Sequence, residues 1–304
     1  MILVQQMLVL FVLMGIGYFC GKKGFITDEF SKNLSWLVVN VATPAMILNA
    51  GMNYESSIRG KELLFGFGMA LLVYAFLIAI SFLVIPLLRI PDNDKNVYRV
   101  MTIFSNIGFM GLPILQAAYG SEAVLYGAIF QFPYNFLIYT YGIAAMKGGN
   151  ALGSSEGLKR IINVGVISSL LAIVIYVSGI HMPVVIRTSA RHLSNLAAPL
   201  SMMVIGQSMI HFKLRGIRGN IRLLAFSILK LVTFPILGML LLSFFVKDEM
   251  LLHVCYIMLA TPVGSMTAMV AQQYGGNYTL AAKGVALSTV LSVITIPLVS
   301  LLIF

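Results

Sequence analysis

The feature that most limits the fold of this chain is a succession of long apolar runs. A helix that spans the hydrocarbon core of a membrane needs about 20 largely apolar residues, and ten runs in the chain reach that length. Charged residues make up 10% of the sequence, against roughly a quarter in a soluble domain. We therefore expect an all-α membrane protein with ten transmembrane helices. The expected spans are residues 1–20, 33–52, 63–88, 100–119, 123–146, 160–180, 189–210, 223–246, 250–272 and 278–303.

An internal repeat divides the chain into two halves. At one fixed offset of 155 residues, Asn40–Pro44 aligns with Asn195–Pro199, Tyr119-Gly120 with Tyr274-Gly275, and Gly24 with Gly179. Each half holds five expected helices, so the second half enters the membrane from the opposite side, as in the inverted repeats of secondary transporters. The predicted organisation is a first five-helix repeat at 1–146, a Gly/Ser-rich linker at 147–157 and a second, inverted repeat at 158–304.

Lys and Arg residues are distributed unevenly between alternate loops. One set of loops carries most of them, including Lys22, Lys23, Arg89 and Lys147. Because cytoplasmic loops are enriched in Lys and Arg, we expect the central linker in the cytoplasm and both termini outside. The net charge of +10 is dispersed in short loops, so it indicates topology within membrane lipid and not a nucleic-acid partner.

The fourth apolar run is interrupted near its midpoint by residues that weaken a helix. Gly108 and Gly111 lower helix propensity, and Pro113 removes a backbone donor. Backbone groups freed within a membrane must find partners or line a polar cavity, and half-helix ends carry partial charges that suit an ion. Asn106 adds an uncharged donor and acceptor. These four residues form the first part of the predicted substrate site, and a simple packing kink is the alternative.

The ninth apolar run is interrupted in the same way. It contains Pro262, Gly264, Ser265 and Thr267, with the proline ahead of the small polar residues instead of after them. Two interrupted helices in corresponding positions of two repeats are typical of a transporter binding site. We therefore predict that the broken fourth and ninth helices together hold the substrate.

Four further polar residues lie within the runs and complete the predicted site. Gln131 and Asn135 share a helix face at i, i+4 spacing. Hydrogen bonding between helices would explain the presence of Gln131, Asn135 and Asn40 in apolar runs as well as contact with a substrate would. Lys230 lies about eight residues inside its span, roughly 12 Å deep at the helical rise. Its charge makes it a candidate counter-charge for an anionic substrate.

The chemistry that the runs lack is also informative. All ten carboxylates fall in loops or at helix ends, so a proton relay built on a buried carboxylate is not supported. The four histidines have no metal-ligand spacing, and H-E-x-x-H, G-x-S-x-G and Walker motifs are absent. We predict no enzymatic activity, no cofactor and no metal site.

The whole pattern resembles the auxin efflux carrier family, in its prokaryotic branch with a short central linker. The resemblance rests on the ten helices in two inverted halves, on Asn40 and Pro44, on Asn106–Pro113 in the fourth helix and on Ala260–Pro262 in the ninth. It implies a fold shared with bile-acid/sodium symporters and a location in the cytoplasmic (inner) membrane of a prokaryote. The first, second, sixth and seventh helices would form a scaffold at a homodimer interface. The others would form a transport domain in which the fourth and ninth helices cross.

The resemblance also implies a small organic anion as substrate, with Asn106 at the position of the crossover Asn that binds the substrate carboxylate. Many members carry a second Asn in the ninth helix after the proline, whereas this chain has Gly264–Thr267 without Asn. Plant-type auxin specificity is therefore not implied.

Together these observations predict a secondary transporter that moves a small organic anion, a carboxylate-type metabolite, by alternating access. One bundle would move against the other as a rigid body, in an elevator-like manner. A sodium-coupled symporter of a neutral or amphipathic solute on the same fold is one alternative. A passive channel is another.

Overall fold

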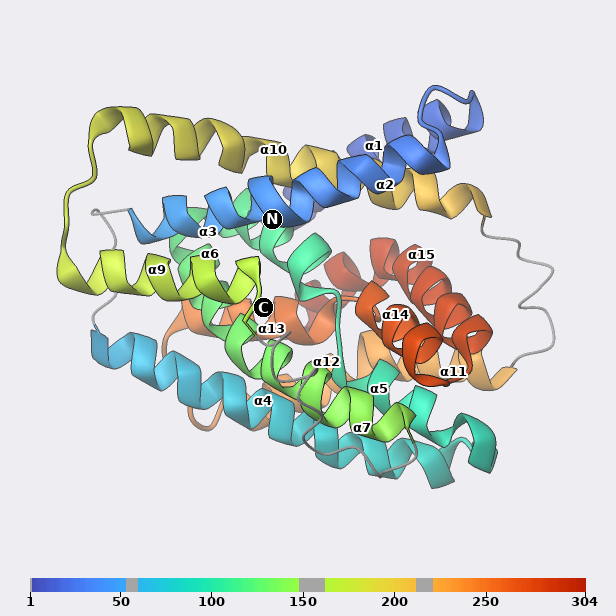
Figure 1. Cartoon of the computed structure of the whole chain (residues 1–304). Helices are drawn as coiled ribbons and strands as arrows, with labels where there is room; N and C mark the ends of the chain where they lie inside the picture. Colours follow the sequence, from blue (N-terminus) through green and yellow to red (C-terminus); the bar gives the residue numbers. More distant parts are fainter. Residues whose placement is uncertain (1, 53–59, 148–161, 212–220) are drawn as a thin grey trace. The chain divides into compact units, whose positions relative to one another are not determined.

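The structure is a computed structural model of the chain, and it describes residues 2–52, 60–147, 162–211 and 221–304. Every regular element in these ranges is a helix (Figure 1), which confirms the all-α prediction. Most of the predicted linker at 147–157 lies outside the described residues.

Five helical segments in the described ranges are long and apolar enough to cross a membrane, and they identify an integral membrane protein. Other predicted spans are shorter or interrupted: α9 (Val164–Ser178) and α13 (Glu249–Ala260) are apolar but have 15 and 12 residues. The arrangement of ten spans in two inverted repeats therefore stays a prediction. The five long segments are Gln5–Lys22, Asp28–Gly51, Gly60–Leu87, Ile221–Leu242 and Tyr278–Ile303.

Left-handed glycines occur at equivalent points of the two halves. Gly24 follows α1 (Ile2–Lys22) and has φ of 80°, and Gly179 follows α9 and has φ of 64°. Gly120 interrupts α6 (Leu112–Leu137) with φ of 78°, and Gly275 ends α14 (Ser265–Tyr274) with φ of 85°. Glycine adopts this conformation without the steric cost that a Cβ would add. These are the two glycine pairs that the sequence offset of 155 residues aligns.

The chain forms two compact units, each built from segments of both sequence halves. Unit 1 takes its described residues from 1–68, 108–131 and 163–211, and unit 2 takes its own from 69–107, 132–162 and 212–304.

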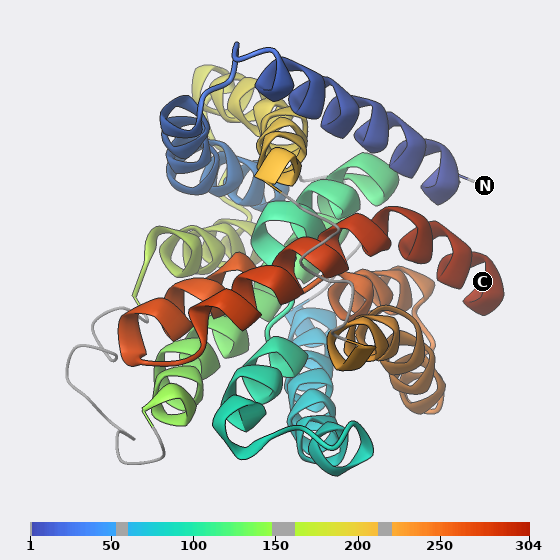
Figure 2. The same cartoon turned by 90° about the vertical axis from the view of Figure 1, so that its right-hand side faces the viewer.

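Unit 1 is held together by close packing of helices through glycine. It contains α1, α2 (Asp28–Leu37), η1 (Val38–Ala42), α3 (Thr43–Gly51), α9, α10 (Val184–Ser208) and η5 (Met209–His211). Helices α1 and α10 lie side by side, as Figure 2 shows for the dark blue and gold ribbons. A Cβ at Gly17 would overlap the backbone of Met203, and one at Gly206 would overlap Met14. Such small-residue contacts let transmembrane helices approach closely.

Unit 2 contains most of the remaining elements, and α4 (Gly60–Leu87) and α6 contribute to both units. Two of its helices are interrupted: α5 gives way to η3, and α13 gives way to α14. Tyr256 of α13 donates a hydrogen bond to the Ile296 carbonyl of α15. The other elements of unit 2 are η2 (Asp92–Asp94), α5 (Lys95–Ile103), η4 (Ile138–Gly142), α7 (Ile143–Met146), α11 (Ile221–Ile228), η7 (Leu229–Thr233), α12 (Phe234–Leu242) and α15 (Tyr278–Ile303).

Candidate functional site

The predicted fourth span is interrupted between α5 and η3 (Ile107–Gly111). Helix α5 ends at Ile103, and residues 104–106 are not helical. Pro113 lies in the first turn of α6, beyond the break. The interruption therefore precedes the proline, which lies in helical backbone that continues from η3 into α6.

The predicted ninth span is interrupted at residues 261–264, between α13 and α14. Here Pro262 lies within the break. The Thr261 side chain donates to the Met258 carbonyl at 3.2 Å, and the Thr261 amide donates to Ile257 at 3.0 Å. These two bonds satisfy carbonyls at the end of α13 that the interrupted helix leaves without intrahelical partners.

The two breaks are joined by backbone hydrogen bonds within unit 2. The Asn106 amide donates to the Pro262 carbonyl at 2.7 Å, and the Gly264 amide donates to the Phe104 carbonyl at 2.9 Å. Ser105 and Val263 thereby form an isolated antiparallel bridge. In a membrane, non-helical backbone is stable only where its polar groups find partners, and this bridge supplies them for both breaks. We refer to residues 104–106 and 261–264 together as the crossover.

Glycine at position 264 lets the two backbones approach closely. A Cβ built on Gly264 would lie 3.0 Å from the Ser105 carbonyl oxygen and 3.2 Å from that of Phe104. The next amide along the break, that of Val263, donates to the Ser288 hydroxyl of α15 at 3.1 Å. The geometry of the crossover is thus fixed from three helices.

Lys230 is completely buried and binds directly to the crossover. It lies in the π-helical turn η7, and its ammonium donates to the Thr102 carbonyl at 3.0 Å and to the Ser105 hydroxyl at 2.7 Å. Thr102 is in the last turn of α5, where a cation is favoured by the partial negative charge of the helix end. Within the described part of the chain, these two neutral oxygen atoms are its only hydrogen-bond partners, so a protonated Lys230 gives the crossover a positive charge without a counter-charge.

Asn106 and Thr267 bring polar side-chain groups to the crossover that have no partner among the described residues. Asn106 is 9% exposed. The Thr267 hydroxyl, in the first turn of α14, is fully buried and makes no hydrogen bond. Ser265, by contrast, is exposed at the first position of α14. The crossover therefore offers the free side-chain amide of Asn106 to a ligand, and the buried Thr267 hydroxyl next to the crossover has no partner.

The other predicted site residues lie outside the crossover. Gly108, Gly111 and Pro113 lie in unit 1, where Gly108 is close to Gln131, whose side-chain nitrogen lies 3.8 Å from a Cβ built on that glycine. Gln131 and Asn135 are both buried in α6. Asn40 donates to the Trp36 carbonyl four residues earlier at 2.9 Å, which is a hydrogen bond within its own helix.

Ser105 belongs to the crossover and was missed by the sequence prediction. A serine within an apolar helix commonly bonds to its own backbone, so the sequence gives no reason to single it out. Its importance comes from Lys230, 125 residues away in sequence.

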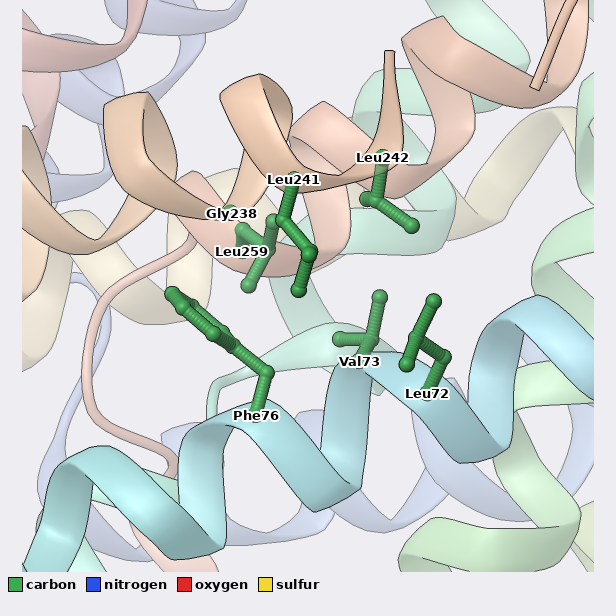
Figure 3. Close-up of a pocket in the computed structure, with 7 residues that line it drawn as sticks. All are labelled: Leu72, Val73, Phe76, Gly238, Leu241, Leu242 and Leu259. Carbon is green, nitrogen blue, oxygen red and sulfur yellow. The ribbon is translucent and has the colours of Figure 1, made fainter. Parts of the chain in front are cut away.

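A separate pocket in unit 2 has the opposite character. Apolar side chains of α4, α12 and α13 point into it (Figure 3). With no polar side chain in its lining, this pocket lacks the donors that an anion needs. The lining residues are Leu72, Val73, Phe76, Gly238, Leu241, Leu242 and Leu259.

Comparison with known proteins agrees with this membrane-embedded architecture. The membrane transport protein family matches the chain over residues 2–157 and 150–300. The chain is also 22% identical to an uncharacterized transporter of Methanocaldococcus jannaschii, with 98% of each chain covered. The protein therefore belongs to the membrane transport protein family, the family of the auxin efflux carriers that its sequence resembles.

Proposed function

We propose that this protein is a secondary transporter that moves a small organic anion across the membrane by alternating access. The observation that carries the proposal is the crossover itself. It combines the side-chain amide of Asn106, which has no partner among the described residues, with the buried ammonium of Lys230. A carboxylate-type metabolite would complete this site, because it accepts hydrogen bonds and balances the positive charge.

The proposed movement is elevator-like, with the crossover carried by one body. Two observations support it. All residues of the crossover, together with Lys230, belong to unit 2, whereas α1, α3, α9 and α10 belong to unit 1. The left-handed glycines at equivalent points of the two halves also favour the inverted repeat of ten spans on which such a movement depends.

The proposed ligand lies against the start of α14. The first amides of a helix carry a partial positive charge that favours an anion, and Gly264, Ser265 and Thr267 form this end of the helix. Asn106 would contact the ligand from the other break. Membrane orientation with the linker in the cytoplasm, a prokaryotic inner membrane and a homodimer are further parts of the proposal that follow from the sequence.

A ligand screen followed by a transport assay tests the function. We expect at least one compound in a panel of small carboxylates to raise the melting temperature of the purified protein, with a shift that grows with ligand concentration. In proteoliposomes the same compound should exchange across the membrane, with uptake accelerated by unlabelled compound inside. If no carboxylate stabilises the protein and none exchanges, the proposal fails.

The same assay separates this function from its two alternatives. A sodium-coupled symporter would take up its solute only with an inward sodium gradient, whereas we expect equal uptake when choline replaces sodium. A passive channel would carry current without acceleration by substrate on the far side. Either result would replace the proposed mechanism.

A further inference from the structure

The hydroxyl of Ser105 is in an unusual electrostatic position. It is 2% exposed and accepts a hydrogen bond from the Lys230 ammonium at 2.7 Å. A hydroxyl has one hydrogen to donate in addition to its lone pairs. No acceptor for that hydrogen is found in the described part of the chain. Because the ammonium draws electron density from the oxygen, the remaining O–H is a strengthened donor.

A second hydroxyl, next to the crossover in the first turn of α14, also lacks an acceptor. The Thr267 oxygen is buried without a partner, and its own backbone amide donates to the Gly264 carbonyl at 3.0 Å. Gly264 is in turn in close contact with the Ser105 backbone. Buried polar groups in native proteins are normally paired, so the unpaired Thr267 hydroxyl and the Ser105 hydroxyl hydrogen without an acceptor favour a ligand with acceptor atoms.

The charge of the site is set by a single residue. A protonated Lys230 contributes one positive charge to the crossover. The described carboxylates of unit 2 lie in η2, ahead of α5, and at the start of α13, whereas Lys230's two partners lie in the last turn of α5 and just beyond it. The partial charges of the helix ends have opposite signs at α5 and α14 and offset each other in part. In a medium of low dielectric constant, a bound complex is most stable when its formal charges sum to zero.

We propose that the crossover selects singly charged organic anions, and that Lys230 sets this selectivity through the Ser105 hydroxyl. This inference rests on the proposed transport of an organic anion. Lys230 is fully enclosed and has no exposed surface for a ligand. It is therefore a positioning residue, which acts on the ligand through Ser105 and by its charge, while Ser105 makes the direct contact.

The test compares anions that have the same skeleton and differ by one charge. The pairs are monomethyl succinate with succinate and monomethyl phthalate with phthalate, titrated against the purified protein at about pH 6.5, where free carboxyl groups are ionised. We expect the monoester to bind the wild-type protein at least about tenfold more tightly than its dianionic partner. The dimethyl esters serve as the neutral ligands: wild type and Lys230→Arg, which keeps the charge, should bind the monoester more tightly than the dimethyl ester, whereas Lys230→Met should bind the dimethyl ester more tightly.

Ser105 variants examine the direct contact. Ser105→Ala should weaken binding of the monoester by about tenfold, because a hydrogen bond to a charged group is lost, and Ser105→Thr should restore part of the loss. Lys283→Met in α15 is the matched control, since it removes a lysine from the same unit and should leave the preference unchanged. The melting temperature of each variant without ligand reports whether it is folded.

Two outcomes overturn the inference while leaving the transport function in place. One is a wild-type protein that binds the dianion as tightly as the monoester. The other is a preference for the monoester over the dimethyl ester that is the same in wild type and Lys230→Met, with the affinity for the monoester unchanged in Ser105→Ala. A wild-type protein that binds no carboxylate at all is a different result, and it would remove the proposed function as well.

Discussion

At residues 104–106 the chain leaves α5 and meets a lysine from another helix, whereas at residues 261–264 it leaves α13 and meets hydroxyl and backbone groups. At the first break, the Lys230 ammonium donates hydrogen bonds to the Ser105 hydroxyl and to the Thr102 carbonyl. In the second, the Val263 amide donates to Ser288 and the Thr261 hydroxyl donates to Met258. The two breaks thus share an extended backbone and differ in charge.

This difference separates two tasks within one site. The backbone bridge between Ser105 and Val263 holds the breaks in register, and it would do so with many side chains. The first break provides the side-chain amide of Asn106 and binds Lys230. The second break is followed by the Thr267 hydroxyl and the start of α14. Substrate identity would then depend mainly on the first break, and the geometry on both.

The largest effect is expected from Gly264→Val, which disturbs the close contact between the backbones of the two breaks. The added side chain would press against the Ser105 carbonyl, and overpacking of this kind costs about 1–3 kcal/mol or more. Gly68→Val in α4 is the control, because a Cβ there would have open space around it. Thermal unfolding of both variants measures the difference. Equal melting temperatures would show that the close approach at Gly264 contributes nothing to stability.

The next effect is expected from Asn106→Ala at the first break. Loss of a hydrogen bond to a charged ligand should weaken substrate affinity by about tenfold. Stability without ligand should change little, because the Asn106 side chain has no partner among the described residues. Titration of a bound carboxylate measures the affinity. Unchanged binding and uptake would remove Asn106 from the mechanism.

Thr267→Val measures how much the hydroxyl next to the second break contributes to stability and to ligand affinity. The substitution keeps the shape of the side chain and removes a buried hydroxyl that lacks a partner. We expect the unliganded protein to become more stable by about 1 kcal/mol, because an unsatisfied polar group costs about 1–3 kcal/mol. Affinity should fall by about fivefold, less than for Asn106→Ala. If affinity falls more than for Asn106→Ala, the second break is the main determinant of binding.

The smallest effect is expected from Asn40→Ala in unit 1. This residue bonds to its own helix through Trp36, so its removal should change uptake by about twofold at most, within the range of a modest local hydrogen bond. The assay is uptake in proteoliposomes at equal protein incorporation. A loss as large as that of Asn106→Ala would place Asn40 in the transport pathway.

The sequence predicts the all-α membrane character and the places of the two helix breaks. Runs of apolar residues have one stable form in lipid, and the clusters of glycine, proline and small polar residues mark the points where a helix is weakest. Within the fourth run the sequence is less informative. Pro113 is the strongest helix breaker there, yet the structure interrupts the helix at residues 104–106, where pairing with Pro262 and Gly264 compensates the backbone.

The role of Ser105 could not be predicted from the sequence, because it depends on a contact between distant segments. Rise per residue predicts that Lys230 lies deep in its span, but it gives no direction for the side chain. The π-helical turn at Leu229–Thr233 changes the helical register locally, so regular helical spacing does not apply across it. Ser105 becomes notable only when the ammonium is seen to bind it.

The bridge between Ser105 and Val263 has a consequence for the entropy of binding. Loops that fold around a ligand lose conformational freedom at the moment of association, and that loss weakens affinity. Here the amides of Asn106 and Gly264 are already bonded across the two breaks, so the backbone is ordered before any ligand arrives. A small metabolite can then bind through few contacts, because little conformational entropy is lost. The backbone of the crossover keeps the same conformation after the ligand dissociates.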